Sequence, residues 1–317
     1  MQILMANPRG FCAGVSRAID VVEKVLALET TPVYVRHEVV HNRAVVQDLK
    51  QKGAIFVKEV DEIPDGAVCI FSAHGVSQAV QDAAKAKGLK VYDATCPLVT
   101  KVHREVRQAS AKGHPCVLIG HKGHPEVDGT IGQYHPNDGQ IYLVETVADV
   151  DQLDIPETQG LVYATQTTLS VDETKDIIAR LKQRFPEIQA PKKADICYAT
   201  QNRQDAVKSL AESVDLMIVV GSQNSSNSNR LKELAEQYQI AGYLVDDPAH
   251  LQAKWFDNAK VCGVTAGASA PEYLVNQVVD QIKQFVDHAE VKAFEGVQET
   301  VTFPLPKLLK TQLSSRS

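Results

Sequence analysis

Three of the six cysteines in this sequence have the positions expected of metal ligands. Each opens a stretch with a helical pattern, and they are Cys12, Cys96 and Cys197. The N-terminus of a helix stabilises a thiolate, which is the form of cysteine that binds a metal. The three are 84 and 101 residues apart in the chain, and no Cys-x-x-Cys pair is present. Only the folded body of the protein can therefore bring them together.

Three ligands leave one coordination position open, which is typical of a catalytic centre rather than a closed structural site. The alternative is that these cysteines are buried structural thiols, since free cysteine is often buried. That interpretation suits the other cysteines better, because each lies inside an apolar strand pattern: Cys69, Cys116 and Cys262.

Two polar loops follow each of the three ligand cysteines at similar distances. The first loop comes 29, 28 or 30 residues after the cysteine and contains His41, His124 or Asn227. The second loop contains His74, Thr167 or Ser269. This recurring order predicts three units, near residues 1–96, 97–193 and 194–286, followed by a C-terminal tail, 287–317, that packs on the surface.

Most of these loops come directly after a short apolar run, which in parallel α/β sheets is the carboxyl edge where ligands bind. Neutral donors and helix N-termini can hold a diphosphate there without a Walker loop. Taken singly, each of these residues also suits a helix cap or a solvated loop. The residues expected to line such an anion pocket are His41, His74, His124, Ser225, Ser226, Asn227 and Ser269.

Glu126 is the only carboxylate in a first polar loop. A glutamate beside a metal site is a candidate proton donor, and an ordinary surface glutamate is its alternative.

The elements that must position these residues alternate along the chain. Short, non-alternating apolar runs predict buried strands at 33–35, 54–57, 68–71, 116–119, 141–144, 216–220 and 242–245. Helical patterns lie at 18–28, 99–111, 171–185, 206–212, 229–238 and 272–286. The alternation predicts an α/β fold with mostly parallel sheets, and we expect an irregular tail from about residue 289.

Three helix starts carry capping signals. Thr95 is expected to cap the helix that follows Cys96. Two pairs have the capping-box spacing, Ser170 with Glu173 and Ser269 with Glu272.

The composition is that of an ordinary globular protein, with 44% hydrophobic and 23% charged residues among 317. A net charge of −6 argues against nucleic acid or an anionic membrane as a partner. No apolar run approaches the ~18 residues of a transmembrane helix, and the N-terminus lacks the pattern of a secretory signal. We therefore expect a cytoplasmic protein whose cysteines are thiols or metal ligands.

The motifs around these residues resemble the 4-hydroxy-3-methylbut-2-enyl diphosphate reductase family, also called IspH or LytB. The resemblance covers about residues 1–286 and is carried by 7–15, 37–42, 72–76, 93–97, 123–126, 165–168, 196–200, 221–228 and 265–269. Among these stretches are Gly10-Phe11-Cys12, Ala94-Thr95-Cys96-Pro97 and Thr165-Gln166-Thr167-Thr168.

The resemblance implies three similar α/β units in a pseudo-threefold arrangement around a central iron–sulfur site. Cys12, Cys96 and Cys197 would hold one 4Fe–4S cluster whose fourth iron is open to substrate. The seven pocket residues would bind the diphosphate, Thr167 would place the substrate hydroxyl, and Glu126 would deliver protons.

The resemblance also implies a reaction. It is the reductive dehydroxylation of (E)-4-hydroxy-3-methylbut-2-enyl diphosphate to isopentenyl and dimethylallyl diphosphate, the last step of the methylerythritol phosphate route to isoprenoids. The electrons would come from a flavodoxin or ferredoxin.

Two other functions remain compatible with three cysteines. One is a zinc hydrolase that acts on a phosphate ester, which would be colourless rather than brown. The other is a non-catalytic iron–sulfur or redox-sensing protein, which would need neither a diphosphate pocket nor Glu126.

Overall fold

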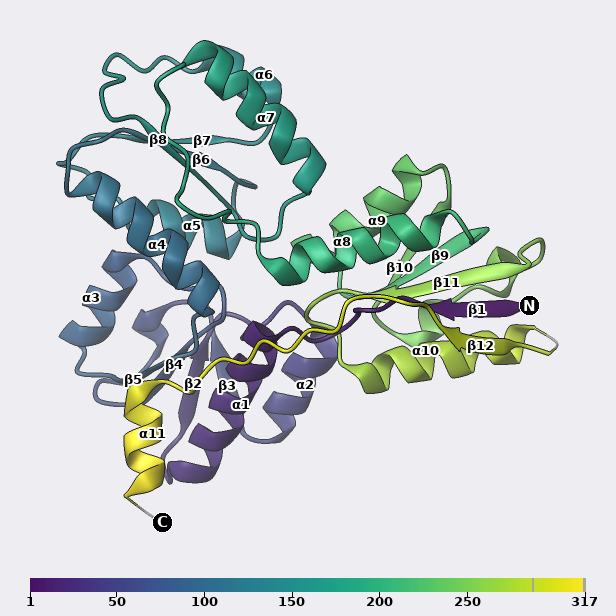
Figure 1. Ribbon diagram of the computed structural model, residues 1–317. Helices are drawn as coiled ribbons and strands as arrows, with labels where there is room; N and C mark the ends of the chain where they lie inside the picture. Colours follow the sequence, from purple (N-terminus) through teal and green to yellow (C-terminus); the bar gives the residue numbers. More distant parts are fainter. Residues whose placement is uncertain (287, 316–317) are drawn as a thin grey trace. The chain divides into compact units, whose positions relative to one another are not determined.

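The computed structural model of the 317-residue chain describes residues 1–286 and 288–315. It is an α/β protein with three parallel sheets, and Figure 1 shows their strands. The chain forms two compact units. Unit 1 comprises Met1–Ser16, Val40–Asp48 and Tyr198–Thr302, and unit 2 comprises Arg17–Val39, Leu49–Cys197 and Phe303–Ser317. No helix in the described part of the chain is long and apolar enough to cross a membrane.

Unit 1 is built on a five-stranded sheet with the order β10-β9-β11-β1-β12. Its strands are β1 (Gln2–Met5), β9 (Leu216–Val220), β10 (Ala241–Val245), β11 (Val261–Ala266) and β12 (Glu290–Ala293). Its helices are α8 (Tyr198–Ala211), α9 (Ser226–Gln237) and α10 (Glu272–Phe285), with short 3-10 turns η2 (Pro248–His250) and η3 (Ala253–Trp255).

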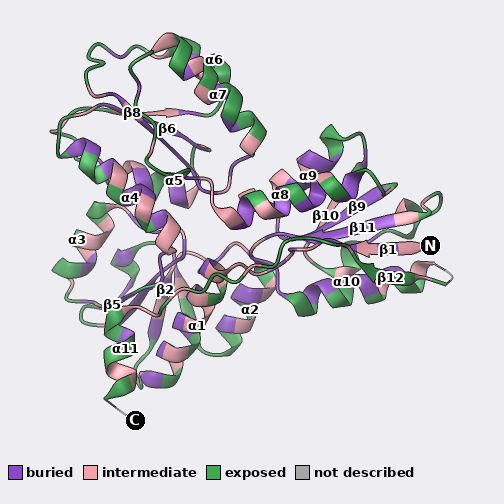
Figure 2. Cartoon of the chain, viewed as in Figure 1, coloured by how far each residue is buried: buried purple, intermediate pink, exposed green. Residues whose placement is uncertain are grey.

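Alternate residues of β9 pack against different helices, as expected of a strand buried on both faces. Ile218 and Val220 share a core with α10, whereas Met217 and Val219 share one with α8 and α9. In Figure 2 the central strands β9 and β11 are accordingly buried, whereas the edge strand β12 is exposed, and the helices bury one side and expose the other.

Unit 2 contains a four-stranded sheet with the order β3-β2-β4-β5. Its strands are β2 (Val33–Arg36), β3 (Ala54–Val57), β4 (Val68–Phe71) and β5 (Lys90–Asp93). The helices of this region are α1 (Ala13–Leu28), α2 (Arg43–Gln51), α3 (Gln78–Ala86) and α11 (Lys307–Ser314), with η1 (Val60–Glu62). Helices α1 and α2 begin in unit 1 and end in unit 2.

The second sheet of unit 2 has three strands in the order β7-β6-β8. They are β6 (Cys116–Ile119), β7 (Ile141–Val144) and β8 (Val162–Thr165). The helices are α4 (Pro97–Ser110), α5 (Pro125–Ile131), α6 (Val147–Gln152) and α7 (Val171–Arg184). Cys116 and Leu118 of β6 pack against α4 and α5, and Val117 and Ile119 pack against α6 and α7.

The structure confirms every strand expected from an apolar run and adds β1, β5, β8, β11 and β12. Strand β1 pairs in parallel with β11 on one side and β12 on the other. The expectation of an irregular tail was wrong, because the tail contributes β12 and α11. All four residues of β12 are exposed, so its apolar pattern is weak, and it forms because the β1 edge offers unpaired backbone groups.

The buried-core interpretation of Cys69, Cys116 and Cys262 is confirmed. All three have 0% exposure and lie in β4, β6 and β11. Burial raises the pKa of each thiol to about 12, so these cysteines stay neutral and pack as small apolar side chains.

Candidate functional site

Each of the remaining cysteines immediately precedes a helix, as the sequence predicted. Cys12 precedes α1, Cys96 precedes α4 and Cys197 precedes α8. All three side chains are partly exposed, unlike the cysteines inside strands. Their thiols therefore lie at the N-termini of three helices.

The backbone N–H groups of these cysteines have equivalent partners. The N–H of Cys12 donates to the carbonyl of Ala268 at 3.1 Å. The N–H of Cys96 donates to the carbonyl of Ala73 at 3.0 Å, and that of Cys197 donates to the carbonyl of Thr167 at 3.0 Å. Each acceptor is the second residue after the end of a strand, namely β11, β4 and β8. The repeat that was visible as a spacing in the sequence is thus also a repeat of local geometry.

Cys96 is itself the N-cap of α4, and Pro97 is the first residue of that helix. The expectation that Thr95 caps the helix was wrong, since its hydroxyl donates to the carboxylate of Asp93 instead. The reason is Pro97, which forces the residue before it out of the helical region and so places the cap at Cys96.

The donor set fits an iron–sulfur cluster better than the closed site of a zinc finger. If all three thiols bound one cluster, they would supply three sulfur ligands and would leave one coordination position open. Among residues 1–286 and 288–315, no three His, Cys, Asp or Glu side chains form a group that could hold a metal ion.

Glu126 is buried in unit 2, so its surface alternative is excluded. It is the second residue of α5 and is only 3% exposed. The backbone N–H of Thr167 donates to its Oε1 at 2.6 Å, and the hydroxyl of Thr167 bonds its Oε2 at 3.0 Å. Burial raises the pKa of Glu126 to about 7, and the two bonds from Thr167 oppose this shift. A carboxyl group with this pKa can carry and release a proton near neutral pH.

Two of the predicted histidines come together near this carboxyl group. The rings of His74 and His124 meet edge to face, with centroids 5.8 Å apart. His124 is the N-cap of α5, and its Nδ1 accepts from the backbone N–H of Glu126 at 3.1 Å. A neutral His124 must therefore carry its proton on Nε2. Ser72, which the sequence did not single out, lies 3.4 Å from Nδ1 of His74.

The predicted polar residues of unit 1 also gather in one place. Ser225 caps α9, and Ser226 is the first residue of that helix. The amide oxygen of Asn227 accepts from the backbone N–H of Ala268 at 2.9 Å. The hydroxyl of Ser269 donates to the backbone carbonyl of His41 at 2.8 Å.

Asn224 was not predicted and belongs to the same group, with its amide 3.3 Å from Nδ1 of His41. No local signal distinguishes it, because it is one of several polar residues in a loop. Ser269 is not a helix cap as expected. Pro271 precedes α10, and the restriction that a proline places on its neighbour delays the helix start to Glu272.

The start of α9 approaches the sheet of unit 1 unusually closely. A Cβ atom on Gly221 or Gly267 would come within 2.2 or 2.0 Å of the Ser228 hydroxyl oxygen. Ser228 has 0% exposure and bonds the Ser225 hydroxyl at 3.0 Å. These two glycines therefore allow the N-terminus of α9 to sit against the ends of β9 and β11, which positions Ser225, Ser226 and Asn227.

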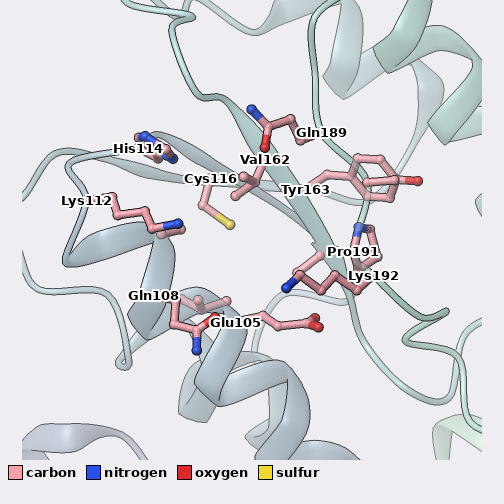
Figure 3. A pocket seen from close by; sticks show the side chains of 14 residues that line it. Glu105, Gln108, Lys112, His114, Cys116, Val162, Tyr163, Gln189, Pro191 and Lys192 are labelled. Carbon is pink, nitrogen blue, oxygen red and sulfur yellow. The ribbon is translucent and has the colours of Figure 1, made fainter.

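A cavity of about 130 Å³ lies at the amino ends of β6 and β8, away from the carboxyl ends that carry the predicted site residues (Figure 3). Its lining includes Cys116 and Val162, the first residues of those strands, together with His114 and Lys192. None of the predicted site residues lines it, since they follow the carboxyl ends of the strands.

Comparison with known proteins agrees with the geometry. The family model described as LytB protein matches residues 3–283. The 4-hydroxy-3-methylbut-2-enyl diphosphate reductase of Francisella philomiragia subsp. philomiragia is 65% identical over 314 residues, which are 99% of each chain. The protein of the same name from Francisella tularensis subsp. tularensis is 64% identical over 315 residues, again 99% of each chain.

Two solved structures are similar. One is the E-1-hydroxy-2-methyl-but-2-enyl-4-diphosphate reductase from Plasmodium falciparum, with a TM-score of 0.93, 38% identity and coverage of 100% of this chain and 98% of that chain. The other is an (E)-4-hydroxy-3-methyl-but-2-enyl diphosphate reductase, with a TM-score of 0.63, 35% identity and coverage of 89% and 99%. The family match over most of the chain and these full-length relatives show that the chain belongs to the LytB protein family.

Proposed function

We propose that this protein is an oxidoreductase that converts (E)-4-hydroxy-3-methylbut-2-enyl diphosphate into isopentenyl and dimethylallyl diphosphate. Relatives 64% and 65% identical over 99% of this chain bear the name of that reductase. One similar structure is described as the terminal enzyme of the non-mevalonate pathway. The observation that carries the proposal is the buried Glu126, held by Thr167 and with a pKa near 7.

The reaction needs a proton source because hydroxide is a poor leaving group. Breaking the allylic C–O bond consumes two electrons and two protons and releases one water. Glu126 is suited to protonate the departing oxygen, because its burial keeps it protonated up to about pH 7. The hydroxyl of Thr167 bonds that carboxyl group and is suited to orient the substrate hydroxyl.

Cys12, Cys96 and Cys197 are the proposed ligands of one 4Fe–4S cluster. When bound, such a cluster supplies single electrons and an open iron that acts as a Lewis acid on the substrate oxygen. Support comes from the three helix N-terminal thiols and from their equivalent backbone partners. A flavodoxin or ferredoxin is the proposed electron donor, in the reducing cytoplasm where thiols persist.

The diphosphate is proposed to bind the two polar groups described above. In unit 1 these are His41, Ser225, Ser226, Asn227 and Ser269, and in unit 2 they are His74 and His124. Support comes from the N-termini of α5 and α9, since backbone N–H groups there attract anions.

The test is anaerobic assembly with iron and sulfide, followed by a visible spectrum, metal analysis and turnover of the diphosphate substrate. A brown protein with about four irons that forms both products supports the proposal. A colourless protein that binds one zinc and hydrolyses phosphate esters would favour the zinc hydrolase. A brown protein that neither binds nor turns over the substrate would favour a non-catalytic iron–sulfur protein. Glu126→Gln tests the proton donor in the same assay.

A further inference from the structure

A cationic side chain holds the backbone that leads into Cys12. Arg203 of α8 donates to the carbonyl of Gly10 from Nε at 3.0 Å and from Nη2 at 2.7 Å. Its Nη2 also lies 3.4 Å from the carbonyl of Phe11. These are the two residues before Cys12. The Arg203 side chain has 0% exposure, so this contact is part of the interior of unit 1.

The backbone before Cys96 is held in the same way in unit 2. Nη1 of Arg17, on α1, donates to the carbonyls of Ala94 at 3.1 Å and Thr95 at 3.0 Å. These are again the two residues before the cysteine. The guanidinium of Arg17 therefore places its positive charge beside the backbone that leads into Cys96.

A lysine replaces arginine before Cys197. Lys101 of α4 donates to the carbonyls of Lys193 and, at 3.4 Å, Ala194. It also forms an ion pair with Asp195, whose side chain has 0% exposure and whose Oδ2 accepts from the backbone N–H of Thr165 at 2.9 Å. The segment that Lys101 contacts ends at Asp195, two residues before Cys197.

The three cations share a position in the sequence. Arg17 comes five residues after Cys12, Lys101 five residues after Cys96, and Arg203 six residues after Cys197. Each therefore lies on the helix that follows one ligand cysteine and holds the loop before a different one. Arg17, on the helix after Cys12, holds the loop before Cys96. Lys101, on the helix after Cys96, holds the loop before Cys197. Arg203, on the helix after Cys197, holds the loop before Cys12.

Each cation also has a partner that keeps it in place. Glu299 accepts from Nη1 and Nη2 of Arg203 at 2.9 and 3.2 Å, and Asp195 pairs with Lys101. Nε of Arg17 donates to the carbonyl of Pro304 at 2.7 Å. The C-terminal tail thus contributes to two of the three contacts.

We propose that Arg17, Lys101 and Arg203 are positioning residues for the cysteine ligands, each holding one ligand loop and placing a positive charge beside it. This inference rests on the proposed iron–sulfur function. Groups that orient a ligand from outside control how firmly the metal is held. Fixed positive charge next to a thiolate-bound cluster favours its reduced form, because reduction adds negative charge.

The test uses anaerobically assembled full-length protein and the variants Arg17→Gln, Lys101→Gln and Arg203→Lys. A chelator removes the cluster, and alkylation followed by peptide mass spectrometry shows which cysteine is exposed first. We expect loss about 10-fold faster than in the wild type, the usual effect of removing an outer contact to a ligand. The first exposed cysteine should be Cys96, Cys197 and Cys12, respectively.

Two further variants separate charge and ligand effects from general weakening. Arg17→Gln removes a positive charge and should lower the midpoint potential of the cluster. Arg17→Lys keeps that charge and should restore the potential. Arg184→Gln is the matched control, because Arg184 donates to the carbonyls of Val150 and Leu153 at the C-terminal end of α6, where there is no cysteine. It should leave the rate of loss, the order of exposure and the potential as in the wild type. If Arg203→Lys does not fold, Glu299→Gln replaces it, with Cys12 again expected first.

The same order of exposure in every variant, or unchanged loss rates and potentials, would overturn this inference alone. If assembly protects none of the three cysteines in the wild type, the proposed iron–sulfur function fails and this inference fails with it.

Discussion

Thr167 bonds both carboxyl oxygens of Glu126, through its backbone N–H at 2.6 Å and its hydroxyl at 3.0 Å. The same residue accepts from the backbone N–H of Cys197 through its carbonyl at 3.0 Å. One residue therefore connects the candidate acid to a candidate cluster ligand. Movement of Thr167, in the loop after β8, would therefore displace the carboxyl group of Glu126 and the backbone of Cys197 together.

Replacing Glu126 by Gln should stop proton delivery without disturbing the fold, because the amide is close in shape and can still accept from Thr167. We expect turnover to fall about 10²–10⁴-fold, the usual contribution of a general acid. The iron content and the reduction of the cluster by dithionite should remain as in the wild type. A variant with near wild-type turnover would show that the proton comes from elsewhere.

The turnover of the wild type should depend on the protonation of Glu126. Its pKa is raised to about 7, so it is protonated below that pH and loses its proton above it. We expect kcat to be highest below about pH 7 and to decrease as pH rises through that value. Glu126→Gln has no such group, so its residual rate should lack this decrease. A profile shared by both proteins would contradict the assignment.

The same shift predicts a pH effect on stability in the protein without a cluster. The folded state of Glu126 binds its proton more tightly than the unfolded state, whose pKa is near 4.5. Its contribution to stability is therefore fully present below pH 4.5 and is lost as pH rises through about 7. Between pH 5 and 8 the unfolding temperature of the wild type should fall relative to that of Glu126→Gln. Parallel curves for the two proteins would show that burial does not raise this pKa.

Cysteine replacements should separate ligands from core residues. Changing Cys12, Cys96 or Cys197 to Ser should remove the brown colour and the activity. The matched change at Cys116, which has 0% exposure in β6, should retain both and cost about 1 kcal/mol of stability. Metal analysis and thermal unfolding check this, and a colourless Cys116→Ser beside a brown Cys96→Ser would reverse the assignment.

Inorganic pyrophosphate should compete with the substrate if the polar groups bind a diphosphate. His74→Gln should weaken that competition by roughly 1–3 kcal/mol, the cost of losing one hydrogen bond to a charged group. His114→Gln is the control, because His114 lines the cavity at the opposite strand ends. Equal inhibition constants for the two variants would remove His74 from the anion site.

Gly267→Ala should destabilise unit 1, because the new Cβ would lie 2.0 Å from the hydroxyl oxygen of Ser228. Such overpacking costs roughly 1–3 kcal/mol. The added change Ser228→Gly removes the clashing side chain and should recover part of that loss. Denaturant unfolding of the single and double variants measures this coupling, and strictly additive effects would contradict it.

Much of the site could be predicted from the sequence because its signals are local. A cysteine at the start of a helical pattern and a cysteine inside an apolar run differ within a few residues of each position. The strand ends are equally local, so the loops with His74, His124 and Ser225 were placed correctly at the carboxyl ends of β4, β6 and β9. Ser170 also caps α7 as its spacing predicted.

The tertiary structure alone decided which distant groups meet. The raised pKa of Glu126 depends on its burial and on Thr167, which is 41 residues away in the chain. Arg203 contacts Gly10 across 193 residues, and β1 pairs with β11 at the other end of the sequence. Periodicity describes only a residue's own element, whereas these contacts depend on how separate elements pack. The chemistry of the ligands is therefore visible in the sequence, while the groups that hold and tune them become visible only in the fold.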